Sequence, residues 1–237
     1  MSWDPVWEEI FRQQAWGRYP GEELIRFVAR NFSGVPDRRQ VRILEVGCGP
    51  GPNLWFMARE GFSVYGVDGS ASAIAQARAR LDGECPGWSG ELRVGDIGNL
   101  PFDDGFFDGV IDNEAVYCNS FEQSRAIYGE MARVTRPGGR LFVRTFARGS
   151  WGDGTGEQVG HNAWLVTEGP MAGKGYSRFT ALDDIPELLG GFEVSEVELL
   201  TRTMGGRQHE VREWLITGTG VQPASGCRCG KGRGGEQ

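Results

Sequence analysis

The segment from Ile43 to Gly51, ILEVGCGPG, constrains the fold of this chain more than any other part of the sequence. Its short apolar run leads into a turn that contains Gly47, Gly49 and Gly51, and Pro52 follows where a helix tolerates proline, in its first turn. A buried strand that runs through a glycine turn into a helix is typical of the first unit of an α/β domain. The sequence therefore predicts a parallel sheet that contains this strand.

Short strands and amphipathic helices alternate from residue 41 to residue 146. Ser70 can cap one helix, and Ser120 with Gln123 forms a capping box for a later one, which Pro137 is expected to end. Such alternation indicates βαβ units and a parallel sheet. The strands expected from the apolar, β-branched runs are Val41–Val46, Ser63–Val67, Glu91–Val94, Phe107–Ile111 and Arg140–Thr145.

Further stretches lie before and after this alternating part. Residues 3–32 carry apolar side chains at helical spacing and are predicted to be helical. Residues 147–180 are rich in glycine and too long for a plain connection, so we expect them to cover an active site. A short helix is expected over residues 183–189, and two strands over residues 192–201 and 210–217 are expected to pair antiparallel at the edge of the sheet.

The composition limits the size and the location of the protein. The chain has 237 residues, so we expect one domain over residues 1–219, followed by a disordered tail over residues 220–237 to which we assign no function. A net charge of −7 argues against nucleic acid, and no apolar run is long enough to cross a membrane. An odd number of scattered cysteines favours the reducing cytoplasm, and Cys227 with Cys229 is not expected to bind a metal; the cysteines are Cys48, Cys85, Cys118, Cys227 and Cys229.

The glycine turn and the acids that follow the next two strands indicate a nucleoside ligand. Glycines allow close approach to the backbone, and free N–H groups at the start of a helix favour an anionic group. Asp68 follows the second strand, where a carboxylate can accept bonds from both ribose hydroxyls. Asp96 ends the third strand and can accept from an adenine amino group, against whose ring Ile97 can pack. Pro52 stands where the dinucleotide fingerprint needs its third glycine, and Glu45 precedes the turn, so a nicotinamide cofactor fits poorly.

These motifs together resemble those of the class I S-adenosylmethionine-dependent methyltransferases, over roughly residues 41 to 146. The branch that contains the ubiquinone and menaquinone biosynthesis methyltransferases is the most similar. The resemblance implies a Rossmann-like, doubly wound α/β fold with seven strands in the order 3-2-1-4-5-7-6, the seventh antiparallel, and an N-terminal helical cover over residues 1–36. The motifs are Leu44–Gly51, Val67–Asp68, Gly95–Asp96, Leu100–Phe102 with Phe107–Val110, and Arg136–Gly139.

The resemblance also implies which residues bind S-adenosylmethionine. The glycine turn would hold the methionine part, Asp68 the ribose, and Asp96 with Ile97 the adenine. Asn113 would lie beside the cofactor, although it can also cap a turn, and Ile97 can equally be a core residue. Trp16, Tyr19 and Pro20 would join the cover, or pack as core. The residues expected to bind the cofactor are Glu45, Gly47, Cys48, Gly49, Gly51, Asn53, Asp68, Gly69, Asp96, Ile97, Asn113 and Tyr19.

Methyl transfer from a sulfonium is an in-line displacement, for which alignment and exclusion of water can suffice. A hydroxyl or amine acceptor also needs a base, and His161, Asp112 and Glu114 are the candidates, each of which can instead have a structural role. Related enzymes often carry a histidine where this chain has Tyr117–Asn119. We therefore expect a methyltransferase that acts on an O, N or C atom of a small molecule, as a monomer or homodimer. A regulatory protein that binds the cofactor without catalysis is the alternative.

Overall fold

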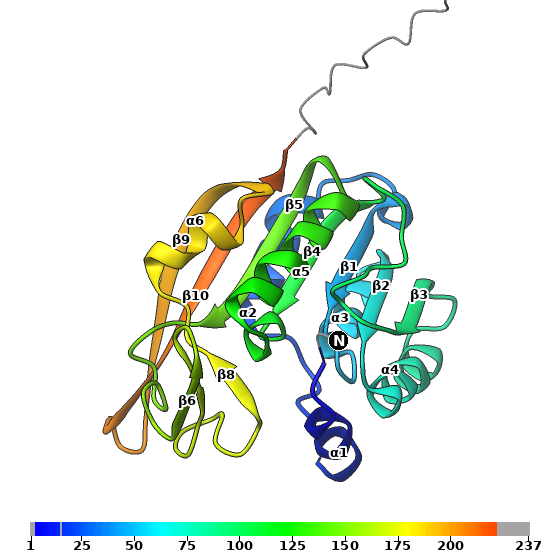
Figure 1. Cartoon of the computed structure of the whole chain (residues 1–237). Coiled ribbons are helices and arrows are strands. Elements are labelled where there is room, and N and C mark those ends of the chain that lie inside the picture. The colour runs from blue at the N-terminus through cyan, green and yellow to red at the C-terminus, as the bar shows by residue number, and fades with distance from the viewer. Residues whose placement is uncertain (1–2, 15, 222–237) are drawn as a thin grey trace, which may run out of the picture.

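The computed structural model describes residues 3–14 and 16–221, in which a seven-stranded sheet forms the centre of the molecule (Figure 1). The strand order is β3-β2-β1-β4-β5-β10-β9. The first five strands pair in parallel, whereas β10 is antiparallel to both of its neighbours. The predicted order and the antiparallel edge are thus confirmed. The strands are β1 (Arg42–Val46), β2 (Ser63–Asp68), β3 (Ser89–Val94), β4 (Phe107–Asn113), β5 (Thr135–Phe146), β9 (Phe192–Met204) and β10 (His209–Gly220).

Helices cover both faces of the sheet because successive side chains on a strand point to opposite faces. On β1, Ile43 packs with α2, α3 and α4, whereas Leu44 packs with α5 and α6 on the other face. The fold is therefore doubly wound, as predicted. The helices are α1 (Val6–Gln13), α2 (Glu22–Phe32), α3 (Pro52–Arg59), α4 (Ala71–Glu84), α5 (Phe121–Val134) and α6 (Ile185–Leu188), with 3₁₀ turns η1 (Arg38–Gln40), η2 (Val116–Cys118) and η3 (Leu182–Asp184).

The local signals in the sequence place the helix starts correctly and one helix end incorrectly. Ser70 accepts a hydrogen bond from the Ala73 N–H at 3.0 Å, and Ser120 forms the expected capping box with Gln123. Helix α5, however, ends at Val134, before Pro137. Strand β5 begins at once, because Thr135 already pairs with β4, so the proline lies inside the strand rather than after the helix.

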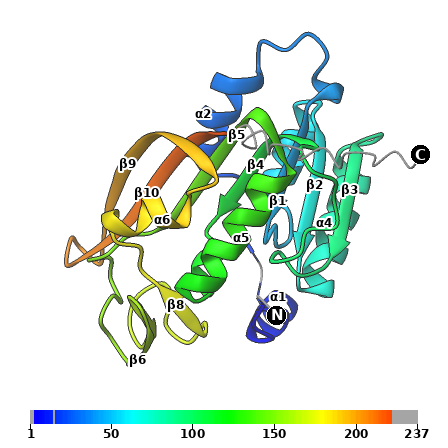
Figure 2. The ribbon, with the colours of Figure 1, turned by 45° about the horizontal axis from the view of Figure 1, so that its top comes forward.

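Residues 147–180, expected as a cover, contain a small sheet that the sequence did not reveal. It consists of β6 (Glu157–Gly160), β7 (Ala163–Leu165) and β8 (Tyr176–Arg178), in antiparallel order β6-β7-β8. Strands of three or four residues are too short to show a clear alternation of apolar and polar side chains. Figures 1 and 2 show this sheet beyond the end of the large sheet where β4 and β5 end, with α1 at the same end.

The hairpin formed by β9 and β10 extends past the large sheet toward the small one. Strand β10 pairs with β5 only from Glu213 to Thr219, whereas its pairing with β9 begins at His209. The His209 ring stacks on the Trp151 ring, 3.9 Å between centroids and 9° apart in plane. The hairpin and the 147–180 segment therefore contact each other at this end of the molecule.

Gly220 was predicted to be the first residue of the disordered tail, but it lies in a strand. Gly220 is the last residue of β10, because it pairs with Phe192 of β9. Residues 222–237, with Cys227 and Cys229, lie outside the described residues. No helix in the described part of the chain has both the length and the apolar character needed to span a membrane.

Candidate active site

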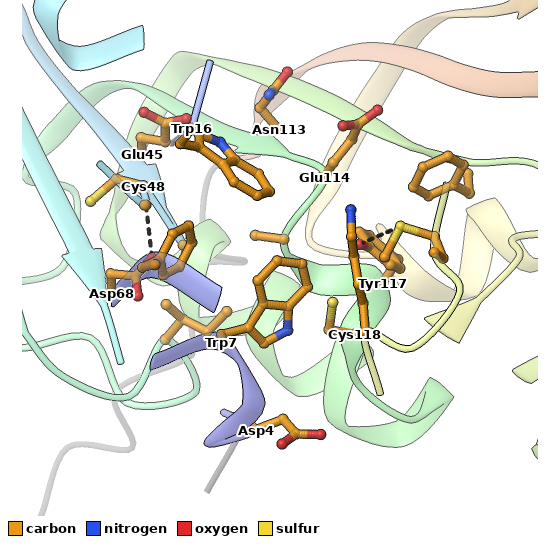
Figure 3. A pocket seen from close by; sticks show the side chains of 18 of the residues that line it. Asp4, Trp7, Trp16, Glu45, Cys48, Asp68, Asn113, Glu114, Tyr117 and Cys118 are labelled. Atoms are coloured by element: carbon orange, nitrogen blue, oxygen red, sulfur yellow. Dashed lines mark hydrogen bonds between the residues drawn. The ribbon is translucent and has the colours of Figure 1, made fainter. Parts of the chain in front are cut away.

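A cavity of about 360 Å³ opens at the carboxyl end of the parallel strands, where α/β folds bind their ligands. Figure 3 shows Glu45, Cys48 and Asp68 on one side of it and Tyr117 with Cys118 on the other. We call these sides the β1–β2 end and the η2 end. Most of the predicted cofactor residues line the cavity, namely Glu45, Gly47, Cys48, Gly49, Asn53, Asp68, Gly69, Ile97 and Asn113.

The glycine turn has the expected backbone but not the expected free amides. Gly47, Gly49 and Gly51 have φ values of 61°, 52° and 77°, which favour glycine. The N–H groups of Gly47 and Cys48 donate to the Val67 carbonyl oxygen, and the Gly49 N–H donates to Asp68. The turn is therefore bonded to the end of β2, which holds it rigid but occupies these donors. No side chain of the described residues caps α3, so no side-chain cap satisfies the first N–H groups of this helix.

Gly47→Ala is expected to destabilise the protein. A Cβ atom at Gly47 would lie 2.3 Å from the Ala115 Cβ, and the left-handed φ adds strain of about 1–3 kcal/mol. The free energy of unfolding in urea should fall by at least that amount. Gly83→Ala, inside α4 with open space around it, is the matched control and should stabilise by about 0.5–1 kcal/mol. Equal stabilities of the two variants would contradict the packing described here.

Glu45 presents an unpaired carboxylate oxygen at the β1–β2 end of the cavity. Its Oε1 accepts a hydrogen bond from Asn53 Nδ2 at 2.5 Å, whereas Oε2 is buried without a partner among the described residues. Burial raises the pKa of Glu45 to about 8, although the Asn53 bond opposes this. A buried, unpaired carboxylate oxygen is stabilised by a cationic ligand group such as an ammonium.

Asp68 links the glycine turn to α4 and still has acceptor capacity. Oδ2 accepts from the Gly49 N–H and Oδ1 from the Ser70 N–H, each at 2.8 Å. A carboxylate has about four acceptor positions, so two remain for ligand hydroxyls. Burial raises the pKa of Asp68, and the two backbone bonds oppose the rise. Because Asp68 lines the cavity, its position suits the predicted ribose contact.

Helix α1 closes one side of the cavity with aromatic side chains. Trp7, Phe11 and Trp16 line the cavity and pack together, with ring centroids 5.2–6.1 Å apart. Glu8 ties this helix to the start of α4 by accepting a hydrogen bond from Ser70 Oγ at 2.5 Å. The apolar face of α1 is therefore held over the glycine turn.

Three residues expected at the cofactor do not line the cavity. Tyr19 is 69% exposed and packs on Trp55 outside it, because the chain turns away after Trp16. Gly51 faces Ala77 of α4, and Asp96 accepts a hydrogen bond from the Gly98 N–H at 2.9 Å. At this edge the neighbours Gly95 and Ile97 line the cavity instead.

The structure does not bring two of the three base candidates to the cavity. Asp112 is fully buried below it, where Oδ1 accepts from the Ala115 and Val116 N–H groups. His161 lies between β6 and β7, bonds to Asp184 at 2.8 Å and does not line the cavity. Both side chains are engaged in structural contacts, whereas Glu114 lines the cavity.

Tyr128→Phe is expected to destabilise the protein by about 1–3 kcal/mol. The Tyr128 hydroxyl donates to Asp112 Oδ2 at 2.7 Å, and its loss leaves that buried oxygen without a donor. Burial already raises the pKa of Asp112, so stability is retained at low pH and lost as the pH rises through that pKa. The deficit of the variant in urea unfolding should therefore grow with pH. Tyr65→Phe, whose hydroxyl has no hydrogen bond among the described residues, is the control and should show no such trend.

The η2 end contains residues that the sequence analysis missed. Glu213 of β10 is fully buried, and Lys174 reaches the cavity from the connection between β7 and β8. A signal for Glu213 was present, since it shares a strand face with the apolar Val211 and Leu215. The other missed lining residues come from separate elements and carry no common pattern; they include Trp3, Asp4, Phe146, Met171, Arg202 and Met204.

Comparison with known proteins identifies the central part of the chain. Residues 43–139 match the family described as methyltransferase domain. The chain is 34% identical over 137 residues to malonyl-[acyl-carrier protein] O-methyltransferase of Erwinia billingiae, which covers 56% of this chain and 47% of that protein. It is also 34% identical over 112 residues to demethylmenaquinone methyltransferase of Beutenbergia cavernae, covering 46% and 42% of the two chains. The chain thus spans about half the length of these curated relatives.

The fold agrees with this match. A SAM-dependent methyltransferase from Methanosarcina mazei superposes with a TM-score of 0.61 at 19% identity, covering 77% of this chain and 93% of that one. The matched residues 43–139 include β1 to β4 and the glycine turn, which carry the β1–β2 end of the cavity. Residues 43–139 of the chain thus match a methyltransferase domain, and the fold of the chain is similar to that of a SAM-dependent methyltransferase.

Proposed function

We propose that this protein transfers the methyl group of S-adenosylmethionine to a small-molecule acceptor. The observation that carries the proposal is a cavity lined by Glu45, Asp68 and the glycine turn, in which Glu45 Oε2 has no partner among the residues that the structure describes. Glu45 offers an acceptor to the ammonium of the methionine part, and Asp68 offers acceptors to the ribose. Ile97 at the third strand provides an apolar surface for the adenine.

The charges of the cavity support a cationic ligand. Its lining contains five carboxyl side chains but two cationic ones, Lys174 and Arg202, of which Arg202 is already paired with Glu213; the acids are Asp4, Glu45, Asp68, Glu114 and Glu213. S-adenosylmethionine supplies an activated, electrophilic methyl group on a sulfonium. Asp68 favours that positive charge when it is ionised, and a bound cation stabilises the ionised form of Glu45, whose pKa is about 8. The aromatic side chains of α1 exclude water from the site.

We further propose that Glu114 takes the proton of an O–H or N–H acceptor. Glu114 directly follows β4 at the cavity, and its side chain is 30% exposed there. Burial raises its pKa, so the ionised form is a stronger base than an ordinary glutamate. Tyr117, Phe146 and Met171 line the η2 end and suit the apolar body of an acceptor. The unpaired cysteines Cys48, Cys85 and Cys118 support a location in the reducing cytoplasm.

Calorimetry tests the proposed function directly. S-adenosylmethionine and S-adenosylhomocysteine should both release heat on titration into the protein, whereas NAD should not. A methylated product, found by mass spectrometry after incubation with labelled S-adenosylmethionine, then separates an enzyme from a protein that only binds the cofactor. No heat with either sulfur compound would remove the proposal.

The affinity for S-adenosylhomocysteine is expected to rise with pH. Glu45 has a pKa of about 8, so its carboxylate becomes charged, and binds an ammonium better, as the pH rises toward that value. The gain is at most about tenfold per pH unit. 5′-Methylthioadenosine lacks the amino-acid part and is the control ligand, with no expected rise. A rise that persists in Glu45→Gln would contradict the role given to Glu45.

A further inference from the structure

Four charged side chains of alternating sign lie on adjacent strands at the η2 end of the cavity. They are Glu114 after β4, Arg144 on β5, Glu213 on β10 and Arg202 on β9, and the strands adjoin in that order. The Glu114 N–H donates to the Arg144 carbonyl oxygen at 2.8 Å, which fixes the start of the row. The row begins at the cavity and ends at Arg202, whose side chain is 55% exposed.

The contacts make Glu213 the centre of this row. Its carboxylate is 0% exposed and accepts two hydrogen bonds from Arg144 Nη2, at 2.9 and 2.7 Å, and one from Arg202 Nη2 at 3.2 Å. The same Arg144 approaches Glu114 with its Nε at 3.3 Å, but that Nε has no hydrogen-bond partner within the described part of the chain. One guanidinium therefore bridges both carboxyl groups and bonds fully to only one of them.

The backbone of Glu114 adopts a sterically unfavourable conformation. Its φ of 61° lies in the left-handed region, which glutamate rarely adopts. Such strain persists where surrounding contacts over-determine it, and it concentrates at functional sites. The other charged or titratable groups around Glu114 are Tyr117 of η2 and Lys174, both of which line the cavity, and Glu23 of α2, which acts on Arg144.

We propose that Glu114 and Glu213 form one proton-sharing carboxyl pair, in which Glu213 is a positioning residue that holds the acceptor's proton on Glu114 during methylation. In the reaction the acceptor's O–H or N–H bond breaks and its proton goes to Glu114, which then donates a hydrogen bond to the Glu213 carboxylate. The new bond forms between the acceptor atom and the methyl carbon, while the carbon–sulfur bond breaks and leaves its electron pair on sulfur. The inference rests on the proposed function for the reaction, but the bridging of both carboxyl groups by Arg144 is present without any ligand.

The electrostatics of the pair agree with this geometry. Burial and a hydrogen bond to Glu213 raise the pKa of Glu114, whereas Arg144 lowers it. Burial also acts to raise the pKa of Glu213, but its hydrogen bonds with Glu114 and Arg144 outweigh that and lower it. The proton of the pair therefore resides on Glu114, which faces the cavity.

Infrared spectroscopy of protein labelled with ¹³C-glutamate tests the pair without any acceptor. Subtracting the Glu114→Gln spectrum isolates the protonated carboxyl of Glu114 from that of Glu45, which is also protonated near neutral pH. In Glu213→Gln the Glu114 proton should be lost at a pH lower by at least about one unit, a tenfold change in proton affinity. Glu210→Gln, on the exposed part of the same strand, is the matched control and should leave the titration unchanged.

Arg202→Met is a second variant for the same titration, in case Glu213→Gln does not fold. Arg202 is at the exposed end of the row and lowers the pKa of Glu114, so its removal should shift the Glu114 titration to higher pH. A Glu114 titration that is unchanged in both variants would overturn the proposal. Calorimetry with S-adenosylhomocysteine on the same samples distinguishes the two proposals. If the unaltered protein does not bind this compound, the proposed function is refuted, whereas the proposal of a Glu114–Glu213 pair is not affected.

Discussion

Asp68→Ala is expected to weaken the binding of S-adenosylhomocysteine at least about 100-fold. The variant loses two hydrogen bonds from ribose hydroxyls to a charged group, each worth about 1.5–3 kcal/mol. It also loses the bonds by which Asp68 holds the Gly49 and Ser70 N–H groups, so the glycine turn and the start of α4 become less ordered. Titration calorimetry measures the change.

Asp183→Ala is the control for this prediction, because Asp183 is an exposed carboxylate of η3 far from the glycine turn in sequence. Its affinity should equal that of the unaltered protein. Thermal melts of both variants separate loss of binding from loss of folding. An Asp68→Ala protein that remains folded and binds within a few-fold of the unaltered chain would exclude Asp68 as the ribose ligand.

Glu114→Gln is expected to lower kcat by about 10²–10⁴-fold while leaving the affinity for S-adenosylhomocysteine within a few-fold. Glutamine keeps the size and the polar contacts of the side chain but cannot take a proton. The measurement is the rate of S-adenosylhomocysteine formation with the acceptor identified by mass spectrometry. Glu210→Gln, at an exposed position outside the cavity lining, is the matched control.

The pH dependence gives this prediction a second, independent readout. Burial raises the pKa of Glu114, and only its ionised form accepts a proton, so kcat should rise with pH and level off above that pKa. The same raised pKa means that the carboxyl favours folding below its unfolded pKa, and that this contribution is lost as the pH rises through the folded value. In Glu114→Gln, kcat should therefore no longer fall as the pH is lowered through the pKa of Glu114. The variant should also lose less stability than the unaltered protein as the pH rises. If kcat of Glu114→Gln still fell at low pH, another group would take the proton of the acceptor.

Most of the fold could be predicted from the sequence because its signals are local. Ser70, and Ser120 with Gln123, cap the helices that they were expected to cap, since a cap depends on residues within one turn. The end of α5 was predicted wrongly, because Thr135 leaves the helix to pair with Phe107, a partner distant in sequence. The small sheet of residues 147–180 was missed for the same reason, as strands of three or four residues form through their partners.

The candidate site divides in the same way. The β1–β2 end consists of residues at or near the carboxyl ends of strands, and these ends meet at one edge of a parallel sheet. The location of Glu45, Asp68 and Ile97 at the cavity was therefore predictable. For the base, the sequence left Asp112, Glu114 and His161 open. Residues two apart on a regular strand point to the same face, but β4 ends at Asn113 and Glu114 takes a left-handed φ of 61°. Only the folded chain therefore shows that Asp112 is buried in the core while Glu114 lines the cavity.

The sequence by itself determined the glycine turn and its acidic residues and, through the resemblance to a known family, the strand order. Both depend on short motifs that follow one another in a fixed order along the chain. The tertiary structure alone decided which side chains meet Glu114. Glu213 and Arg202 come from a hairpin about 100 residues farther along the chain. Their register against β5 places a buried carboxylate beside Arg144. Contacts between such distant residues arise from packing of the sheet and leave no local pattern in the sequence.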